Sequence, residues 1–345
     1  MVKPLIYIII LNWNGWKDTI ECLESIQSLK SVNYCIVIVD NFSENDSVEK
    51  IKSWTNGEVK VASNFVTYKK NKKPLNVVEY DKYTAELGGT MEEEQKLSTI
   101  PADQKLVLIK SNANLGFAGG NNVGIRYALA KNDFDYIWIL NNDTVVNPDA
   151  LDQMVIRMEA DSGIGICGST LLYYYEPQKI QALGGATYNK WLGTIRHIGA
   201  YQNKNIKVNN KKIEGKMDYV VGASMLVSKE FLQKVGLLSE EYFLYFEEID
   251  WAVRAKGKFE LGFAPKSIVY HKEGRSIGTN GNPKMKSSIA DYYAIRNRIL
   301  FTRKFYPYVL CTVYLGLLVT LLNRLLRRQT NRIPLIWKAI LDKSI

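Results

Sequence analysis

This chain of 345 residues has few cysteines, and their placement argues against both disulfide-rich and zinc-knuckle proteins. Cys22, Cys35, Cys167 and Cys311 are scattered and show no paired spacing. This pattern argues against a disulfide framework and a zinc knuckle, and it is typical of a protein kept in a reducing cytosol. The chain also lacks a basic segment, an apolar run and a small-residue cleavage site at its start, so secretion is not expected.

Signatures of nucleic-acid binding are missing as well. No helix-turn-helix, zinc-finger or RNA-binding motif occurs, which places nucleic acid last among the partners allowed by a formal net charge of +10. An anionic membrane surface and a polyanionic substrate remain as candidate partners. No internal repeat is present, and the 46% of hydrophobic residues suffice for one large core or two domains.

Short apolar segments alternate with segments of helical spacing along most of the chain. Residues 5–11 and 34–39 predict strands with a helix over 18–29 between them, which makes a βαβ unit. Further strands are expected at 106–109, 136–140, 165–172, 220–227 and 267–270, and further helices at 43–53, 123–130, 231–235, 291–305 and 309–326. The expected fold is therefore α/β, with a mostly parallel central sheet flanked by helices.

Residues 64–105 interrupt this alternation. They carry a run of lysines at 69–73 and a run of glutamates at 92–94. We expect an inserted, solvated excursion with a mobile tip, in which the charge runs are solvated faces.

Asp143 follows the apolar run 136–140, which reads as a buried parallel strand. A carboxylate at the tip of such a strand lies where open α/β sheets bind ligands. With Asn141 and Asn142 beside it, Asp143 suits a hard divalent cation shared with substrate phosphates. The alternative is a turn that ends the strand, since Asn and Asp favour turns.

Two further segments have the composition of a nucleotide site. Glycine-rich residues 114–124 precede a predicted helix. Glycines let the backbone approach a ligand closely, and a helix N-terminus attracts phosphate. Neither the Walker motif nor the glycine spacing of dinucleotide-binding proteins is present. Asp40 and Asn41 end the second strand, where a carboxylate can bind a base or a ribose hydroxyl. The alternative for residues 114–124 is a tight turn between a strand and a helix. The alternative for Asp40 and Asn41 is a turn or a helix cap.

An acid cluster and a histidine complete the set of candidate site residues. Glu247, Glu248 and Asp250 follow the aromatic residues 242–246, and close like charges raise one another's pKa, which suits a general base. An acidic first helical turn is the alternative. His271 is one of two histidines and ends a predicted strand, so it is a candidate metal ligand, although a lone histidine is more often structural.

In this order along the chain, the motifs resemble glycosyltransferase family two, and within it the rhamnosyltransferase-like enzymes of bacterial surface polysaccharide synthesis. The matching pieces are residues 10–15, 39–41, 114–124, 140–143, 222–223 and 247–250 together with His271. The resemblance implies the GT-A fold, a Rossmann-like architecture, followed here by C-terminal helices.

The resemblance also implies roles for individual residues. It makes Asp143 a ligand of Mg²⁺ or Mn²⁺ at the place of the Asp-x-Asp motif, with His271 as a further metal ligand. The family's inverting base lies in the acidic pair, so the resemblance makes Glu248 the first choice, followed by Asp250 and Glu247. The family often has Glu-Asp where this chain has Glu247-Glu248, so all three acids remain candidates. The implied nucleotide-sugar-binding residues are Asn12, Asp40, Asn41, Asn114, Gly116, Asn122 and Asn142.

The implied reaction is a single inverting displacement. The favoured donor is dTDP-rhamnose, with a UDP-sugar as the alternative, and the implied acceptor is a glycan or a polyprenyl-diphosphate-linked sugar. A non-catalytic scaffold subunit of a polysaccharide assembly complex is a second class of function, against which the joint presence of Asp143, the acid cluster and His271 argues. A nucleotidyltransferase is less compatible, because it usually needs more metal-binding carboxylates.

Residues 306–322 contain no charged residue, yet this run is shorter than the roughly 20 apolar residues of a membrane span. Basic residues at 303–304 and 324–328 flank it, which suits a helix lying in or under an anionic leaflet. A helix docked on the catalytic part is the competing interpretation. We therefore expect a catalytic domain over 1–280 and a helical, membrane-associating region over 281–345, with the protein cytoplasmic and peripheral on the inner face of the cell membrane.

Overall fold

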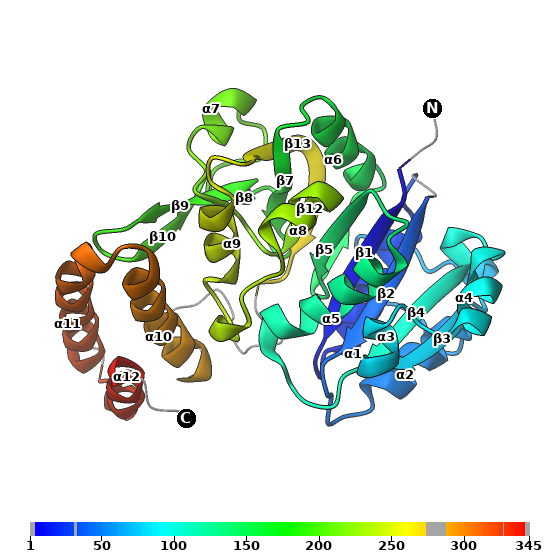
Figure 1. Cartoon of the computed structure of the whole chain (residues 1–345), viewed down its shortest axis with the longest axis horizontal. Coiled ribbons are helices and arrows are strands. Elements are labelled where there is room, and N and C mark those ends of the chain that lie inside the picture. The colour runs from blue at the N-terminus through cyan, green and yellow to red at the C-terminus, as the bar shows by residue number, and fades with distance from the viewer. Residues whose placement is uncertain (1–3, 31–32, 274–287, 327, 342–345) are drawn as a thin grey trace.

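A ten-stranded, mostly parallel sheet forms the centre of the computed structural model, which describes residues 4–30, 33–273, 288–326 and 328–341 (Figure 1). In spatial order its strands are β3 (Asn76–Asp81), β4 (Lys105–Lys110), β2 (Tyr34–Asp40), β1 (Ile6–Asn12), β5 (Tyr136–Asn141), β12 (Ser224–Ser228), β7 (Ile164–Tyr173), β13 (Glu260–His271) and β6 (Thr144–Val146), while β8 (Ile180–Leu183) pairs with β7. Strands β12, β6 and β8 pair antiparallel with their neighbours, and the other pairings are parallel. The expectation of a mostly parallel α/β sheet is confirmed.

The sheet is buried on both faces because its strands are continuously apolar. Alternate residues of β1 point to opposite sides, so Ile8 and Ile9 belong to different core clusters. Helices α1 (Trp16–Ile26), α2 (Ser47–Thr55) and α6 (Ala150–Glu159) contribute to one cluster. Helices α5 (Gly116–Lys131) and α8 (Lys229–Val235) contribute to the other cluster, while α9 (Glu247–Ala255) contributes to both.

Helix α5 begins earlier than predicted and takes in the glycine-rich stretch. A Cβ atom at Gly120 would lie 2.4 Å from Leu11, and one at Gly124 would lie 2.8 Å from Ile9. These two glycines therefore let α5 approach β1 closely. We expected residues 114–124 to form a phosphate-binding turn before the helix. This expectation is wrong for residues 116–124, which belong to α5, and only the start of α5 lies at the edge of the sheet.

The predicted excursion at 64–105 is in part a component of the sheet. Strand β3 is the edge strand, with Val78 and Tyr80 buried, and α3 (Lys82–Glu86) and α4 (Met91–Ser98) follow it. The prediction of a wholly solvated insertion is wrong here, because alternate side chains of β3 pack on the core while the others face solvent.

A second, three-stranded sheet was not predicted. It consists of β10 (Thr194–His197), β9 (Gly185–Asn189) and β11 (Tyr219–Val220), in that order. Helix α9 packs on β11, so this small sheet lies beside the acid cluster. A short helix, α7 (Asn210–Glu214), lies between β10 and β11 in the chain.

Three helices end the chain and lie beyond the small sheet: α10 (Ser288–Phe305), α11 (Leu310–Leu326) and α12 (Ile333–Ile340) (Figure 1). Phe301 of α10 belongs to the core of the main sheet, while α11 and α12 pack on α10 in a small cluster of their own. Within the described residues, the segment Pro307–Leu326 is long and apolar enough to cross a membrane, and 22% of it is buried.

Candidate active site

Asn12 and Asp40 end two neighbouring parallel strands and lie opposite each other in the β1–β2 register. Asn12 Nδ2 donates to Asp40 Oδ1 at 2.7 Å, and both side chains are buried. The Ser43 hydroxyl donates to Asp40 Oδ1 at 2.6 Å, and the Ser43 backbone N–H donates to Asp40 Oδ2 at 3.0 Å. Asp40 is thus a fixed carboxylate at the strand edge, as expected for a residue that orients a nucleoside.

Asn41 joins the end of β2 to the start of α5. Its Nδ2 donates to Asn114 Oδ1 at 2.9 Å, and its Oδ1 accepts from the Leu115 N–H at 2.9 Å. Asn114 Oδ1 also accepts from the Gly116 N–H at 3.0 Å. The structure therefore brings Asn41, Asn114 and Gly116 together next to Asp40.

Asn122 is not part of this network. Its Nδ2 donates to Leu238 O at 2.9 Å and to Glu240 Oε1 at 2.8 Å, and its Oδ1 accepts from the Leu238 N–H. The side chain is fully buried, so its amide holds the loop after α8 against α5. This geometry gives Asn122 a structural role in place of the nucleotide contact that we expected.

Asp143 and His271 meet at the corner where β5, β6 and β13 come together. His271 Nε2 lies 3.2 Å from Asp143 Oδ1, and His271 Nδ1 lies 2.9 Å from Gln181 Oε1. Both side chains are nearly fully buried. Burial opposes charging of the imidazole, but the Asp143 carboxylate outweighs it, and the net effect raises the pKa of His271.

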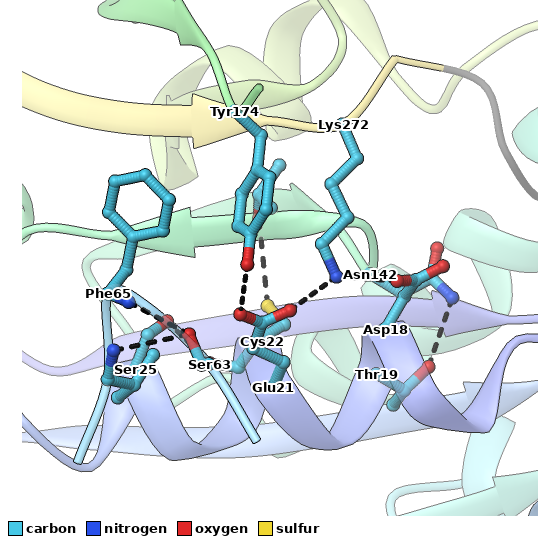
Figure 2. Close-up of polar contacts among 12 residues, drawn as sticks. Asp18, Thr19, Glu21, Cys22, Ser25, Ser63, Phe65, Asn142, Tyr174 and Lys272 are labelled. Carbon is cyan, nitrogen blue, oxygen red and sulfur yellow. Dashed lines mark hydrogen bonds and ion pairs between the residues drawn. The ribbon is translucent and has the colours of Figure 1, made fainter. Parts of the chain in front are cut away.

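Asn142 turns away from this corner toward α1. Its Nδ2 donates to the Thr19 hydroxyl at 3.0 Å (Figure 2), and that hydroxyl donates to Asn12 Oδ1 at 2.7 Å. Asn142 therefore links the Asp143 turn to the Asn12–Asp40 pair through Thr19. Its amide positions the two parts of the site relative to each other.

The Asp143–His271 corner fits a divalent cation that is completed by substrate. One carboxylate and one imidazole, with Gln181 orienting the ring, are a donor set that Mn²⁺ accepts, and a metal bound by few protein groups keeps waters and phosphate oxygens. Among the described residues, no group of three or more histidine, cysteine or acidic side chains is placed to hold a metal by itself. A cation here would therefore depend on the donor diphosphate for part of its coordination.

The three acids of α9 have different surroundings. Glu247 is buried, and no described residue hydrogen-bonds its Oε2; burial, and then the neighbouring Glu248, raise the pKa of this carboxyl well above its usual value. Glu248 is half-buried and lies against Gly222, where a Cβ atom would come within 2.4 Å of Glu248 Oε1. Burial raises the pKa of Glu248 to about 7, although hydrogen bonds from its own and the Gly222 backbone N–H oppose the shift.

Asp250 is fully buried, and both oxygens of its carboxylate have polar partners. Its carboxylate accepts from Tyr242 Oη at 3.0 Å and Arg254 Nε at 2.5 Å, and it pairs with Lys304 Nζ at 3.0 Å. These contacts tie α9 to α10 and favour a structural role for Asp250. The geometry thus leaves Glu248 as the acid best placed for proton transfer.

Asn297 of α10 was missed by sequence reasoning. Its Nδ2 donates to Tyr242 O at 2.6 Å and to Leu244 O at 2.7 Å, in the loop that leads into α9. Phe243, Tyr245 and Phe246 in this loop have positive φ, a conformation that costs L residues free energy and needs support from the surroundings. The only sequence signal was an asparagine within the predicted helix 291–305.

Lys272 was missed too. Its backbone N–H donates to Asp143 O at 3.0 Å, and its ammonium pairs with Asp18 at 2.5 Å and with Glu21, both on α1 (Figure 2). The Tyr174 hydroxyl donates to Glu21 Oε1 at 2.7 Å. Lys272 therefore holds the end of β13 against α1 directly beside His271. The sequence did not predict this contact, because a lysine after a strand is usually exposed to solvent.

A groove of about 520 Å³ borders this clamp. Its walls include Trp16 and Asp18 of α1, the segment 59–64, and Tyr175. Phe65 packs its ring on Tyr174, with centroids 4.7 Å apart, so the segment after α2 is fixed to the end of β7. The start of the predicted excursion at residue 64 thus contributes to the surroundings of the site.

Parts of the chain are similar to known proteins. Residues 88–236 match the family described as "Glycosyl transferase family 2". A low-salt glycan biosynthesis hexosyltransferase of Haloferax volcanii is 26% identical over 193 residues, or 56% of this chain and 58% of that protein. A dTDP-rhamnosyl transferase of Shigella flexneri is 25% identical over 249 residues, or 69% of this chain and 77% of that protein. The chain thus spans less than two thirds of the first relative.

Two solved structures share the fold. A mannosyltransferase from Pyrobaculum calidifontis in complex with GDP-Man and Mn²⁺ superposes with a TM-score of 0.54 at 13% identity, over 100% of this chain and 89% of that one. The polypeptide GalNAc-T7 with UDP, GalNAc and Mn²⁺ superposes with a TM-score of 0.51 at 13% identity, over 78% and 44%. These similarities show that the chain has the GT-A fold. Residues 88–236 are thus similar to glycosyltransferase family two, and a hexosyltransferase and a rhamnosyltransferase are among the similar proteins.

Proposed function

We propose that this enzyme is a metal-dependent, inverting glycosyltransferase that moves a sugar, with rhamnose favoured, from a nucleoside-diphosphate donor to a cell-surface polysaccharide or lipid-linked acceptor. The observation that carries the proposal is the buried Asp143–His271 corner, 3.2 Å across, joined through Asn142 and Thr19 to the Asn12–Asp40 pair. A nucleoside and a metal-bound diphosphate would then occupy adjoining parts of one strand edge. The dTDP-rhamnosyl transferase of Shigella flexneri supports the choice of donor.

Each residue has a task in the proposed reaction. Asp40 and Asn41 orient the nucleoside, and Asp143 and His271 hold the cation, which neutralises negative charge on the departing diphosphate when bound. Glu248 accepts the proton of the acceptor hydroxyl as that oxygen attacks the anomeric carbon from the face opposite the diphosphate. A carboxyl whose pKa is about 7 is well matched to this step, because it is partly ionised at neutral pH and still basic.

A hexose donor is the second candidate for the same site. The Haloferax volcanii relative is a hexosyltransferase, and the two similar structures contain GDP-Man and UDP with Mn²⁺. The carboxylate of Asp40 can accept a hydrogen bond from the N–H of either pyrimidine, uracil or thymine. The donor sugar is therefore the first property to measure.

We also propose that the protein is cytoplasmic and peripheral on the inner face of the cell membrane. Residues 292–341 contain nine lysines and arginines and no aspartate or glutamate. The apolar helix α11 lies within this basic stretch. Basic segments next to apolar helices are attracted to anionic leaflets, where a polyprenyl-diphosphate acceptor would be found.

The test is release of nucleoside diphosphate from dTDP-, UDP- and GDP-sugars, with Mn²⁺ or Mg²⁺ and then with EDTA. We expect turnover of one donor, preferably dTDP-rhamnose, that is lost with EDTA. Binding of a donor without turnover would show that the acceptor is required for turnover. Neither binding nor turnover of any donor would contradict the proposal and favour the scaffold role.

A further inference from the structure

The strongest unexplained feature outside the active site is an apolar surface built from two distant parts of the chain. One part is helix α11, whose residues Leu315, Leu318, Val319 and Leu322 are all exposed and follow one another at helical spacing. The other part is the tip of the β9–β10 hairpin, where Trp191 is 53% and Leu192 45% exposed. We call these two parts together the apolar face.

The two parts are held together by specific contacts. The Thr312 hydroxyl donates to Trp191 O at 2.5 Å, and the Arg298 guanidinium donates to Leu192 O. The Trp191 ring meets the Tyr308 ring edge-on at 6.4 Å. Figure 1 shows the hairpin reaching from the small sheet to α11. The tip is therefore a fixed part of the apolar face.

The hairpin tip is also rigid in itself. Asn189 Oδ1 accepts from the Trp191 N–H at 3.0 Å and the Leu192 N–H at 3.2 Å. The Gly193 N–H donates to Asn189 O at 2.7 Å, and Gly193 has a φ of +61°, which closes the turn. A short turn that is braced in this way and yet presents a tryptophan and a leucine to solvent is typical of a binding surface.

We propose that the apolar face, including the hairpin tip of the catalytic part, inserts into the interface of an anionic lipid bilayer and holds α11 in the membrane plane. This inference deepens the proposed membrane attachment and rests on it. The opposite face of α11, which carries Val313, Leu317 and Leu321, is already buried, and Leu317 and Leu321 pack in the cluster with α10 and α12. A helix that uses one face for protein packing and the other for lipid lies in the interface, whereas a spanning helix would meet lipid or other helices all round.

Charge favours the same occupant. Arg303, Arg328 and Lys338 are exposed around the helices, and Lys190 lies beside Trp191 with its ammonium 3.2 Å from the Tyr308 hydroxyl. Tryptophan and tyrosine prefer the headgroup level of a bilayer, and lysine and arginine pair with anionic headgroups there. This combination of aromatic, aliphatic and basic side chains is complementary to an anionic bilayer.

The hairpin also connects the membrane with the acid cluster. Strand β9 pairs with β11, with Ala186 opposite Tyr219. Burial raises the pKa of Tyr219 well above its usual value, and the nearby Glu248 carboxylate raises it further. The same small sheet thus carries the membrane-contacting tip at one end and borders the candidate base at the other. A lipid-linked acceptor could then be presented to Glu248 without leaving the bilayer.

The experiment is co-sedimentation of the full-length protein with vesicles of phosphatidylglycerol and phosphatidylcholine, compared with phosphatidylcholine alone. We expect binding to the anionic vesicles, and a double substitution W191S/L192S should weaken it about tenfold, since two apolar side chains then lose their lipid contact. The matched control is Ile156→Ser on α6, which is 58% exposed but lies outside the apolar face, and which should bind as wild type.

Quenching of tryptophan fluorescence by brominated lipid gives an independent readout, because W191F should lose most of the quenching seen in wild type. Wild-type vesicle binding by W191S/L192S, or an absence of binding by wild type, would overturn the proposal. Resistance of the bound wild type to alkaline carbonate would also overturn it, because α11 would then span the bilayer. Donor turnover in detergent-free solution separates these outcomes from failure of the proposed enzyme activity.

Discussion

His271 Nε2 lies 3.2 Å from Asp143 Oδ1, and this contact joins the end of β13 to the turn between β5 and β6. Both side chains are buried, and Gln181 fixes the other nitrogen of the imidazole ring. The two groups that we propose as metal ligands are therefore preorganised together with an orienting neighbour, which would reduce the cost of ordering them on binding.

The first prediction concerns Asp143. Asp143→Asn keeps the size of the side chain but removes its charge, so it should lower metal-stimulated transfer by at least about 100-fold, a loss of several kcal/mol of charge stabilisation. Nucleoside diphosphate release measured across a Mn²⁺ titration checks this. Asp149→Asn, which removes an exposed carboxylate paired with Lys30, should leave the titration unchanged. An unaltered Mn²⁺ dependence in Asp143→Asn would refute the assignment.

The second prediction concerns Glu248 and pH. Glu248→Gln should abolish transfer and retain donor binding, because the amide cannot accept the acceptor proton. Burial raises the pKa of Glu248 to about 7, and only the ionised carboxylate is a base, so kcat in the wild type should rise as pH increases through about 7. Measuring kcat from pH 5.5 to 8.5, roughly 1.5 units on either side of that pKa, tests whether kcat rises with pH. Near-normal transfer by Glu248→Gln would remove this residue from the role.

The third prediction separates Asp250 from Glu248. Asp250→Asn weakens the contacts to Arg254 and Lys304, which are partly exposed, so we expect a loss of about 2 kcal/mol in the free energy of unfolding, less than for a fully buried pair. Urea unfolding measures this, and the folded fraction should still turn over donor. Glu230→Gln, in an exposed pair with Lys234, should change stability by less than about 0.5 kcal/mol. Unchanged stability with abolished transfer would instead make Asp250 the base.

The fourth prediction concerns Lys272. Lys272→Met leaves Asp18 and Glu21 without their shared cation, so it should destabilise the fold by about 3 kcal/mol and weaken Mn²⁺ binding, because the end of β13 is released beside His271. Lys272→Arg should restore part of both properties. Calorimetric titration with Mn²⁺ in the presence of nucleoside diphosphate, alongside thermal unfolding, distinguishes these effects. Tight Mn²⁺ binding by folded Lys272→Met would show that Lys272 supports the fold alone.

The control for that prediction is Lys30→Met, which removes a surface cation from an exposed pair with Asp149. It should leave both the unfolding temperature and Mn²⁺ binding close to wild type, since exposed pairs contribute little to stability. A Lys30→Met variant as damaged as Lys272→Met would mean that the assay responds to total charge.

Periodicity and composition were sufficient for the elements that make the sheet. Short apolar runs rich in β-branched and aromatic residues, such as that of β5, favour buried strands, and each is followed by polar residues. Asp40, Asp143 and His271 could therefore be placed at strand ends from the sequence. The same reasoning failed for β3 and for the glycines of α5. The alternation in β3 is short and charged, and the close approach of Gly120 to Leu11 is a contact between distant segments.

The sequence by itself thus determined the α/β class, the order of the motifs and the identity of the polar residues at the strand ends, because these depend on local pattern. Only the tertiary structure decided which of those residues meet. It paired Asp143 with His271, used Asp250 to hold α10, and placed Lys272 and Asn297 beside the site. It also brought the hairpin tip to α11. The physical reason is that these contacts join residues far apart in the chain, whose distances depend on how the whole sheet and its helices pack.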